Sequence, residues 1–360
     1  MTVDSLVSSD AARGPRLPQQ LAGREDIALF FRGRAVLVTG GLGFVGSNLA
    51  RTLLALGAAV TVVDNLHEKY GGSRFNLDGM LGRVELLELD QADEKAMQRV
   101  VGRFDTIFNM VGQVNHVDSM ENPYLDLHTN VTAQISLLEA CRKESPTAKL
   151  VFAGTRGQYG RATVSPVDES APIAPIDVNG INKHAGESYH FLYARCYGLR
   201  ASSLRLTNTY GPRHTMKTAR QGVFAWFVRQ AIDGEEIRLF GGGEQLRDFN
   251  HVSDVVAALI MAMVSPEADG QYFNLGSQEP QSLLHIANTI VAKSGTGSVR
   301  GIPYPAQLKS IEIGDYIGDY RKILRVLGWQ PQVPLEQGIA ETVAYYQQHR
   351  DRYWQQVLYP

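Results

Sequence analysis

The sequence of 360 residues predicts a doubly wound α/β fold with a parallel sheet, and three observations support this prediction. Apolar, strand-like runs alternate with helix-like segments from residue 34 to residue 206, which is typical of a parallel sheet covered by helices on both faces. A glycine-rich turn joins the first strand to the first helix. After residue 206 the alternation gives way to loops, which indicates a second, smaller lobe.

The alternating part of the chain divides into six strands and four helices. We expect strands at residues 35–39, 59–63, 84–88, 106–110, 149–153 and 200–205. We expect helices at residues 46–56, 94–101, 126–142 and 182–197. Ligands of such sheets bind at the carboxyl ends of the strands, so the residues that follow each strand are the first candidates for a site.

The glycine-rich turn predicts a dinucleotide site. Gly40 permits a tight turn, Gly43 lets the backbone approach a pyrophosphate, and Gly46 allows the helix to pack closely on the strand. Asp64 ends the second strand, where a carboxylate accepts hydrogen bonds from an adenosine ribose and repels a 2′-phosphate. These signals favour bound NAD over NADP, and the alternative is a structural turn without a phosphate.

The same patterns divide the chain into a nucleotide-binding part and a second lobe. We expect residues 34–206 to form a Rossmann domain that binds NAD, with residues 248–275 returning to it as a helix (248–263) and a strand (272–275). Residues 207–247 and 276–350 then form an interleaved substrate-binding lobe with helices at 222–233, 283–294 and 335–349. Residues 1–33 have no secretory pattern and are expected to form a partly ordered N-terminal extension.

Composition excludes several classes of protein. A hydrophobic content of 44% supports a large core in a soluble globular protein. The net charge of −2 and the scattered basic residues leave no footprint for nucleic acid or an anionic membrane. The apolar run at 255–264 is too short to cross a bilayer. Cys141 and Cys196 lack metal-ligand spacing, so we expect no metal site, reduced thiols and a cytoplasmic location.

Several motifs occur in an order that resembles the extended short-chain dehydrogenase/reductase family, in particular its NAD-dependent nucleotide-sugar epimerases and dehydratases. The resemblance covers residues 34 to 349 and rests on motifs at 39–46, 64–65, 154–160, 205–212, 247–254, 273–276 and 327–329. UDP-glucose 4-epimerases share this pattern. Gly112-Gln113 and the loop that follows resemble the CDP-tyvelose 2-epimerases more closely.

The resemblance implies two catalytic positions. Thr155 matches the residue whose hydroxyl bonds the sugar oxygen that is oxidised. Lys183 matches the lysine that holds the nicotinamide ribose and lowers the pKa of a neighbouring acid by its positive charge. Without the resemblance, Thr155 would be read as a turn residue and Lys183 as a solvated helix lysine.

The family's catalytic base is missing at its usual position. The family has a tyrosine four residues before the lysine, and this chain has Asn179, whose amide has no useful acid–base titration. His116, in the loop after the fourth strand, is the candidate substitute, because histidine titrates near working pH. Tyr159 and His184 are weaker candidates. A structural role for His116, with little or no redox chemistry in the protein, is the alternative.

The residues after Thr155 restrict the reaction. Dehydratases of the family carry Asp-Glu there and sugar-acid decarboxylases carry Ser-Glu, whereas this chain has Arg156-Gly157. The resemblance therefore disfavours dehydration and leaves epimerisation, in which NAD takes a hydride and returns it to the other face of the same or a neighbouring carbon. The alternatives are a catalytically impaired protein that binds NAD and a nucleotide sugar, and a related sugar-nucleotide lyase or oxidoreductase.

Substrate and cofactor residues follow from the same resemblance. Asn208 and Arg247 are expected to bind the diphosphate of a nucleotide sugar, with Lys309 near the place of a second family arginine. A turn cap for Asn208 and a pair between Arg247 and Asp248 are the alternatives. The expected sugar contacts are Gln113, His116, Thr155 and Asn179. The expected cofactor contacts are Gly40, Gly43, Phe44, Val45, Gly46, Asp64, Asn65, Asp90, Gln91, Val111, Gly112, Asn130 and Lys183.

The resemblance also implies a homodimer. The amphipathic helices near 126–142 and 182–197 resemble the pair that forms a four-helix bundle between two subunits of the family. The alternative is that their apolar stripes face the core of a single subunit.

Overall fold

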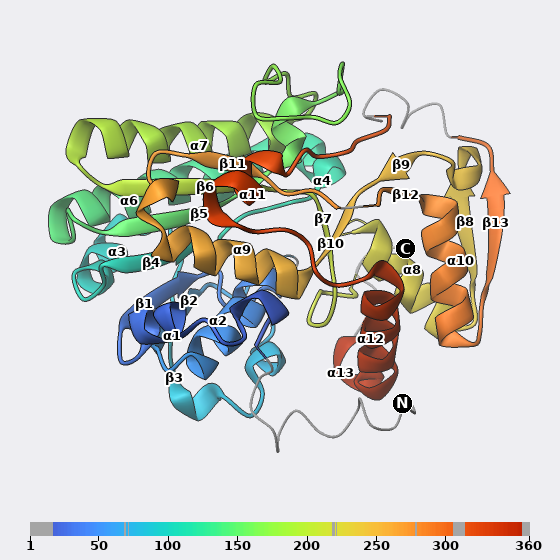
Figure 1. The fold of residues 1–360 in the computed structure, drawn as a ribbon, viewed down its shortest axis with the longest axis horizontal. Coiled ribbons are helices and arrows are strands. Elements are labelled where there is room, and N and C mark those ends of the chain that lie inside the picture. Colours follow the sequence, from blue (N-terminus) through green and yellow to red (C-terminus); the bar gives the residue numbers. More distant parts are fainter. Residues whose placement is uncertain are drawn as a thin grey trace.

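The computed structural model describes residues 17–67, 70, 72–217, 220, 222–277, 279–304 and 314–354. Its centre is a seven-stranded parallel sheet with the order β11-β6-β5-β4-β1-β2-β3, flanked by helices on both faces (Figure 1). Successive strands are added on one side of β1 up to β3 and on its other side from β4 onward. This switch opens a crevice at the carboxyl ends of β1 and β4. The predicted doubly wound fold is confirmed.

The strands form where runs of apolar residues can be buried on both faces of the sheet. Their bounds are β1 (Ala35–Thr39), β2 (Ala59–Asp64), β3 (Val84–Glu88), β4 (Thr106–Asn109), β5 (Lys149–Thr155), β6 (Arg200–Leu206) and β11 (Tyr272–Asn274). In β1, for example, Val36, Leu37 and Val38 are fully buried. Each predicted strand lies within two residues of the observed bounds at either end.

Two hydrophobic clusters cover the two faces of the sheet. One face packs on α1 (Glu25–Phe31), α2 (Phe44–Ala55) and α9 (Val252–Val264). The other packs on α3 (Glu94–Val101), α6 (Ala133–Glu144) and α7 (Val178–Tyr197). Within the expected N-terminal extension, Ile27 and Phe31 of α1 are fully buried in the first cluster.

Two predicted helices are wrong in part. The expected helix at 126–142 is broken into α5 (Pro123–Leu127), a π-helical turn at His128–Thr132, and α6. The expected helix from residue 248 begins only at Val252, because the residues before it form β10 (Phe249–His251), which pairs in parallel with β7 (Asn208–Tyr210). Conversely, α7 begins four residues earlier than expected, because the side chain of Asp177 caps it by accepting the Gly180 N–H at 2.7 Å.

A third hydrophobic cluster forms the second lobe, at the right of Figure 1. Its helices are α8 (Val223–Ile232), α10 (Leu283–Ser294), α12 (Leu335–Gln348) and α13 (Arg350–Tyr353). The chain also forms short strands that the sequence did not reveal, namely β8 (Glu236–Phe240), β9 (Leu246–Arg247), β12 (Gln281–Ser282) and β13 (Ser298–Ile302). Two further short helices are α4 (His116–Glu121) and α11 (Arg321–Leu327).

Among the helices of the described residues, none is long and apolar enough to cross a membrane. The same residues contain no group of three or more His, Cys, Asp or Glu side chains arranged to hold a metal ion.

Candidate active site

The glycine-rich turn lies at the carboxyl end of β1 and leads directly into α2. Gly40 has a φ of +67°, and its N–H donates to the Val63 carbonyl at 2.7 Å. A Cβ on Gly46 would lie 2.2 Å from the Gly40 carbonyl oxygen, so the helix can approach the strand only with glycine there. The Gly43 cap of α2 gives no side-chain hydrogen bond and the first turn carries no acidic residue. The N–H groups of Phe44, Val45 and Gly46 therefore suit a pyrophosphate.

The adenosine side of the expected cofactor path lies beyond β2 and β3. The buried Asp64 carboxylate accepts the N–H groups of Leu42 at 3.0 Å and Leu66 at 2.9 Å, so it braces the glycine-rich turn itself. Burial raises the pKa of Asp64 above its usual range, against the effect of these bonds. Asn65 donates to Asp90 at 3.4 Å, which brings these two expected contacts together.

Gln91, the next expected cofactor contact, is buried beside the start of α6. Its amide nitrogen donates to the Ala133 carbonyl at 3.0 Å, while its amide oxygen has no hydrogen-bond partner among the described residues. The contact to α6 positions the loop after β3 at the edge of the crevice.

The expected nicotinamide side of the cofactor path brings together Gly112, Asn130 and Lys183. A Cβ on Gly112 would lie 3.1 Å from the Lys183 ammonium and 3.2 Å from the Asn130 amide oxygen, so the glycine lets all three meet next to Val111. Lys183 is buried and donates to the Ala153 carbonyl at 2.5 Å. Burial lowers its pKa to about 8, against the attraction of Asp126 and Glu187.

Asn179, at the position of the family tyrosine, is buried in a hydrogen-bond network. Its amide nitrogen lies 2.7 Å from the Gln113 carbonyl oxygen, 3.1 Å from the Gln113 side-chain oxygen and 3.0 Å from a carboxylate oxygen of Asp126. Its backbone N–H donates to the Ser119 hydroxyl, which in turn donates to the His116 carbonyl at 2.7 Å. The first turn of α7 thus fixes both ends of the segment that carries His116.

His116 lies beside Thr155. Its Nδ1 is 2.6 Å from a carboxylate oxygen of Asp177, while 44% of its side-chain surface is exposed. The His116 Cε1 and the Thr155 hydroxyl oxygen each lie 3.4 Å from the point that a Cβ on Gly157 would occupy. His116 of α4 and Thr155 at the end of β5 therefore flank the same glycine, and Asp177 before α7 contacts the histidine.

The weaker base candidates are engaged elsewhere. The buried Tyr159 hydroxyl donates to Asn274 at 2.7 Å and accepts from Arg205 at 2.6 Å. Burial raises the pKa of Tyr159 to about 12, which makes it a poor base. His184 bonds to Gln158 at 2.9 Å, and burial lowers its pKa. Both residues adjoin a buried ion pair between Arg205 and Glu187, 2.6 Å apart, which ties α7 to β6.

The expected diphosphate residues lie where β7, β9 and β10 meet. Asn208 donates to the Asp248 carbonyl at 3.0 Å, and Arg247 donates to the carbonyls of Leu246 and Gly314. The Asp248 carboxylate accepts from Thr207 at 2.6 Å and from the Gly318 N–H at 2.7 Å. Lys309, the remaining expected contact, lies outside the described residues.

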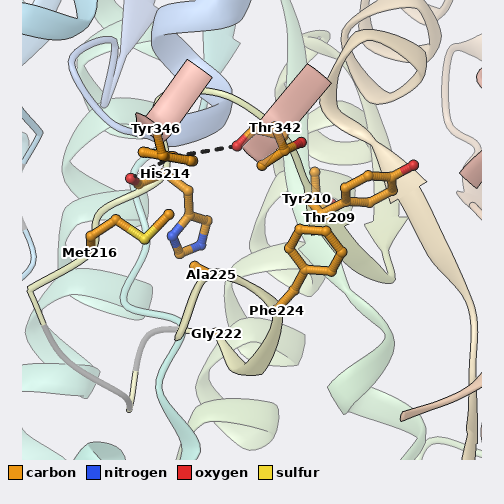
Figure 2. Close-up of a pocket in the computed structure, with 10 residues that line it drawn as sticks. Thr209, Tyr210, His214, Met216, Gly222, Phe224, Ala225, Thr342 and Tyr346 are labelled. Atoms are coloured by element: carbon orange, nitrogen blue, oxygen red, sulfur yellow. Dashed lines mark hydrogen bonds between the residues drawn. The ribbon is translucent and has the colours of Figure 1, made fainter. Parts of the chain in front are cut away.

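A small cavity lies between the loop after β7 and the second lobe (Figure 2). The His214 ring lines it and also contacts Phe44 of the glycine-rich turn, with ring centroids 4.5 Å apart. Its volume of about 20 Å³ fits one water molecule and no sugar. It marks where this loop packs against the turn and α12, separate from the position between His116 and Thr155.

Two residues at the site were missed from the sequence. Asp177 had a usable signal, because an aspartate at the start of a helix is a preferred cap. Asp126 had no such signal in the sequence, since its role depends on two residues of another helix. The Asn179 amide donates to one of its carboxylate oxygens at 3.0 Å, and the Asn182 amide donates to the other at 2.8 Å.

Comparison with known proteins identifies the family of the chain. Residues 36–276 match the model of the NAD-dependent epimerase/dehydratase family. A putative UDP-glucose 4-epimerase of Methanocaldococcus jannaschii is 32% identical over 86% of this chain and 97% of its own. UDP-glucuronic acid decarboxylase 1 of Xenopus tropicalis is 32% identical over 87% of this chain and 72% of its own. The structure of Thermus thermophilus UDP-glucose 4-epimerase with NAD has a TM-score of 0.77 and 31% identity, covering 87% and 98% of the two chains. The chain therefore belongs to the NAD-dependent epimerase/dehydratase family, and NAD is its cofactor.

Proposed function

We propose that the protein is an epimerase of a nucleotide-diphosphate sugar in which His116 replaces the missing tyrosine as base. The observation that carries the proposal is the position shared by His116 and Thr155, both 3.4 Å from the missing Cβ of Gly157. The two side chains thus flank the same glycine, and a sugar hydroxyl that contacts both of them would meet a hydrogen-bonding threonine and a histidine able to take its proton.

Each catalytic group has a separate task. The Thr155 oxygen accepts the Gly157 N–H at 3.1 Å, which leaves its own proton to donate to the sugar oxygen. His116 takes the hydroxyl proton on Nε2 and returns it at the end of the cycle. Lys183, buried next to Gly112, supplies positive charge beside the nicotinamide ribose. When bound, NAD would supply the redox chemistry, taking a hydride from the sugar and returning it to the other face of the same or a neighbouring carbon, so that the cofactor would be restored in each cycle.

The residues after Thr155 favour epimerisation over elimination. The Arg156 guanidinium lies 4.8 Å from the centre of the Tyr316 ring, and a guanidinium does not exchange protons near neutral pH. Gly157 has no side chain to act as acid or base. Neither position therefore supplies the proton transfers that removal of water from the sugar requires.

The assignment of the two lobes follows from the same sites. We assign NAD to residues 34–206 with 248–275, and the sugar nucleotide to residues 207–247 and 276–350. Asn208, Arg247 and Lys309 are the proposed contacts of the diphosphate, and Gln113 and Asn179 hold the loop at the sugar.

A panel of nucleotide sugars tests the epimerase proposal. The purified protein is incubated with UDP-, GDP-, CDP- and dTDP-sugars, including uronic acids, and the products are followed by NMR. Interconverted isomers with no net NADH release support the proposal. Release of carbon dioxide or of a dehydrated sugar contradicts it, and so does a panel that returns unchanged while NAD stays bound.

Asn179 supports a second candidate, a protein that binds NAD and a nucleotide sugar without catalysis. In that case every sugar returns unchanged, yet calorimetry detects binding of a nucleotide sugar to the protein with NAD. Binding alone does not require a histidine that is held by Asp177 beside Thr155, which is why we place this candidate second.

We also propose a homodimer and a cytoplasmic location. Apolar side chains remain exposed on α5 and α7, with exposed fractions of 81% for Tyr124, 42% for Leu127, 53% for Ile181 and 38% for Leu192. A second copy of the chain would cover this face. Cys141 is buried and Cys196 exposed, and both are free thiols, as a reducing compartment allows.

A further inference from the structure

Asp177 makes two separate contacts at the start of α7. One carboxylate oxygen caps the helix by accepting the Gly180 N–H at 2.7 Å. The other lies 2.6 Å from Nδ1 of His116. The Asp177 side chain is only 4% exposed, whereas the His116 side chain is 44% exposed. The carboxylate is therefore held in place by the protein, while the ring that it contacts opens toward solvent and Thr155.

The ionisation state of Asp177 determines which ring nitrogen carries the proton. Burial opposes ionisation, but the bonds from His116 and the Gly180 N–H outweigh it, and the pKa of Asp177 lies below its usual range. An ionised carboxylate only accepts hydrogen bonds, so Nδ1 of His116 must be the donor. The neutral ring then has its lone pair on Nε2, the nitrogen that can accept a proton from a substrate.

We infer that Asp177 is a positioning residue that fixes His116 in the tautomer with Nε2 as the base and stabilises its protonated form. This inference rests on the proposed function, because it gives the base assigned there its working geometry. A serine protease uses the same division of tasks, in which a buried aspartate orients a histidine and does not itself take the proton.

The surroundings of the pair are consistent with this role. Arg156, from the turn after β5, acts on Asp177 by charge and favours the carboxylate. On α4 itself, Asp118 and Glu121 both bind Arg220, at 2.8 and 2.6 Å. Asp177 is therefore the carboxylate in hydrogen-bond contact with the His116 ring, and the other two acids of α4 have a cation of their own.

Exchange of Asp177 for asparagine separates the two contacts. Asp177→Asn keeps an oxygen to cap Gly180 and presents an amide N–H to Nδ1, which moves the ring proton to Nε2 and removes the base. We expect kcat to fall by about 10² to 10⁴, the range of general base catalysis, with little change in KM, NAD content or Tm. Asp93→Asn is the matched control, because Asp93 caps α3 in the same way, with the Ala96 N–H at 3.0 Å, and lies on another element than His116 and its cap.

Asp177→Ser adds a readout that a purely structural role would not change. Serine still caps the helix but removes the negative charge beside His116. The loss of kcat on acidification should then move to lower pH, because the protonated ring has lost its partner. Nitrogen-15 NMR of histidine-labelled protein, with His116→Ala to identify the signal, reports the tautomer without turnover. We expect the Nδ1–H form in the wild type and the Nε2–H form in Asp177→Asn.

The outcomes separate this inference from the proposed function. An unchanged tautomer in Asp177→Asn, or a kcat within threefold of wild type, overturns the role of Asp177 even if His116→Ala is inactive. A kcat loss in Asp177→Ser that accompanies lost stability, with the pH profile unmoved, also overturns it. An active His116→Ala instead removes the base assignment, whatever the NMR spectrum shows.

Discussion

At the scale of single residues, the site compensates for the loss of one side chain. Asn179 cannot take a proton, but its amide and backbone hold Gln113 and Ser119 on either side of His116. The position of the missing base thus supports the loop of the proposed one. Asn179→Tyr should therefore lower activity and Tm, because a phenol has no room in this buried network, and a gain of turnover in that variant would favour the non-catalytic candidate.

We expect the buried ammonium of Lys183 to lower the free energy of unfolding, although the proposed reaction requires its charge. Its folded pKa of about 8 lies below the unfolded value of 10.5, so the unfolded chain binds more protons between these values and stability rises with pH across that window. The full penalty, about 3 kcal/mol, applies below pH 8. Lys183→Met should then be at least as stable as wild type at pH 7, and the advantage should shrink toward pH 10, while NAD-dependent turnover is lost.

Urea unfolding of the NAD-free protein at pH 7, 8, 9 and 10 measures this difference. Parallel stability curves for the two proteins would contradict the prediction. Wild-type turnover should also fall above about pH 8 as the buried ammonium loses its proton.

At the scale of elements, the turn between β1 and α2 depends on a close backbone approach. Gly46→Ala places a methyl 2.2 Å from the Gly40 carbonyl oxygen, so the helix must shift away from the strand. We expect a loss of about 1–3 kcal/mol of stability and weaker NAD binding. Gly82→Ala is the control, because a Cβ there meets no atom within 4 Å. Equal Tm and equal NAD affinity in both variants would show that the turn tolerates the methyl.

The elements also show what the sequence can predict. The strands of the main sheet and helices such as α3 and α10 were predictable because local apolar periodicity and caps determine them. The π-helical turn at His128–Thr132 was not, because Asn130 bonds Gln113 across the site, a contact that local sequence does not encode. Short strands such as β7 and β10 form only because they pair with each other, although 38 residues of chain separate them.

The candidate site was predictable to a similar extent. The glycine-rich turn and Thr155 lie at strand ends, His116 follows β4 and Lys183 lies on α7, positions that strand ends and family motifs identify, while their roles stay predictions. Asp177 and Asp126 were not assigned, because their partners lie on other segments of the chain. The positions of Asn208 and Arg247 against a diphosphate stay predictions.

At the scale of the whole molecule, the exposed apolar face of α5 and α7 predicts a dimer. The double variant Tyr124→Lys and Leu192→Lys should be a monomer, because a dimer would bury the added charges between the two copies. Sedimentation velocity measures the change. Leu29→Lys is the control, since Leu29 of α1 is 64% exposed on the opposite side of the sheet. A monomeric wild type, or a double variant that remains dimeric, contradicts the prediction.

The proposed reaction depends on His116 beside Thr155, so the identity of the base decides the function of the molecule. The most direct test is kcat of His116→Ala on the nucleotide sugar that the wild type isomerises, with NAD content and sugar affinity measured in parallel. We predict a loss of about 10² to 10⁴ in kcat with NAD and sugar still bound. Turnover within a few-fold of wild type would contradict the proposal that His116 is the base.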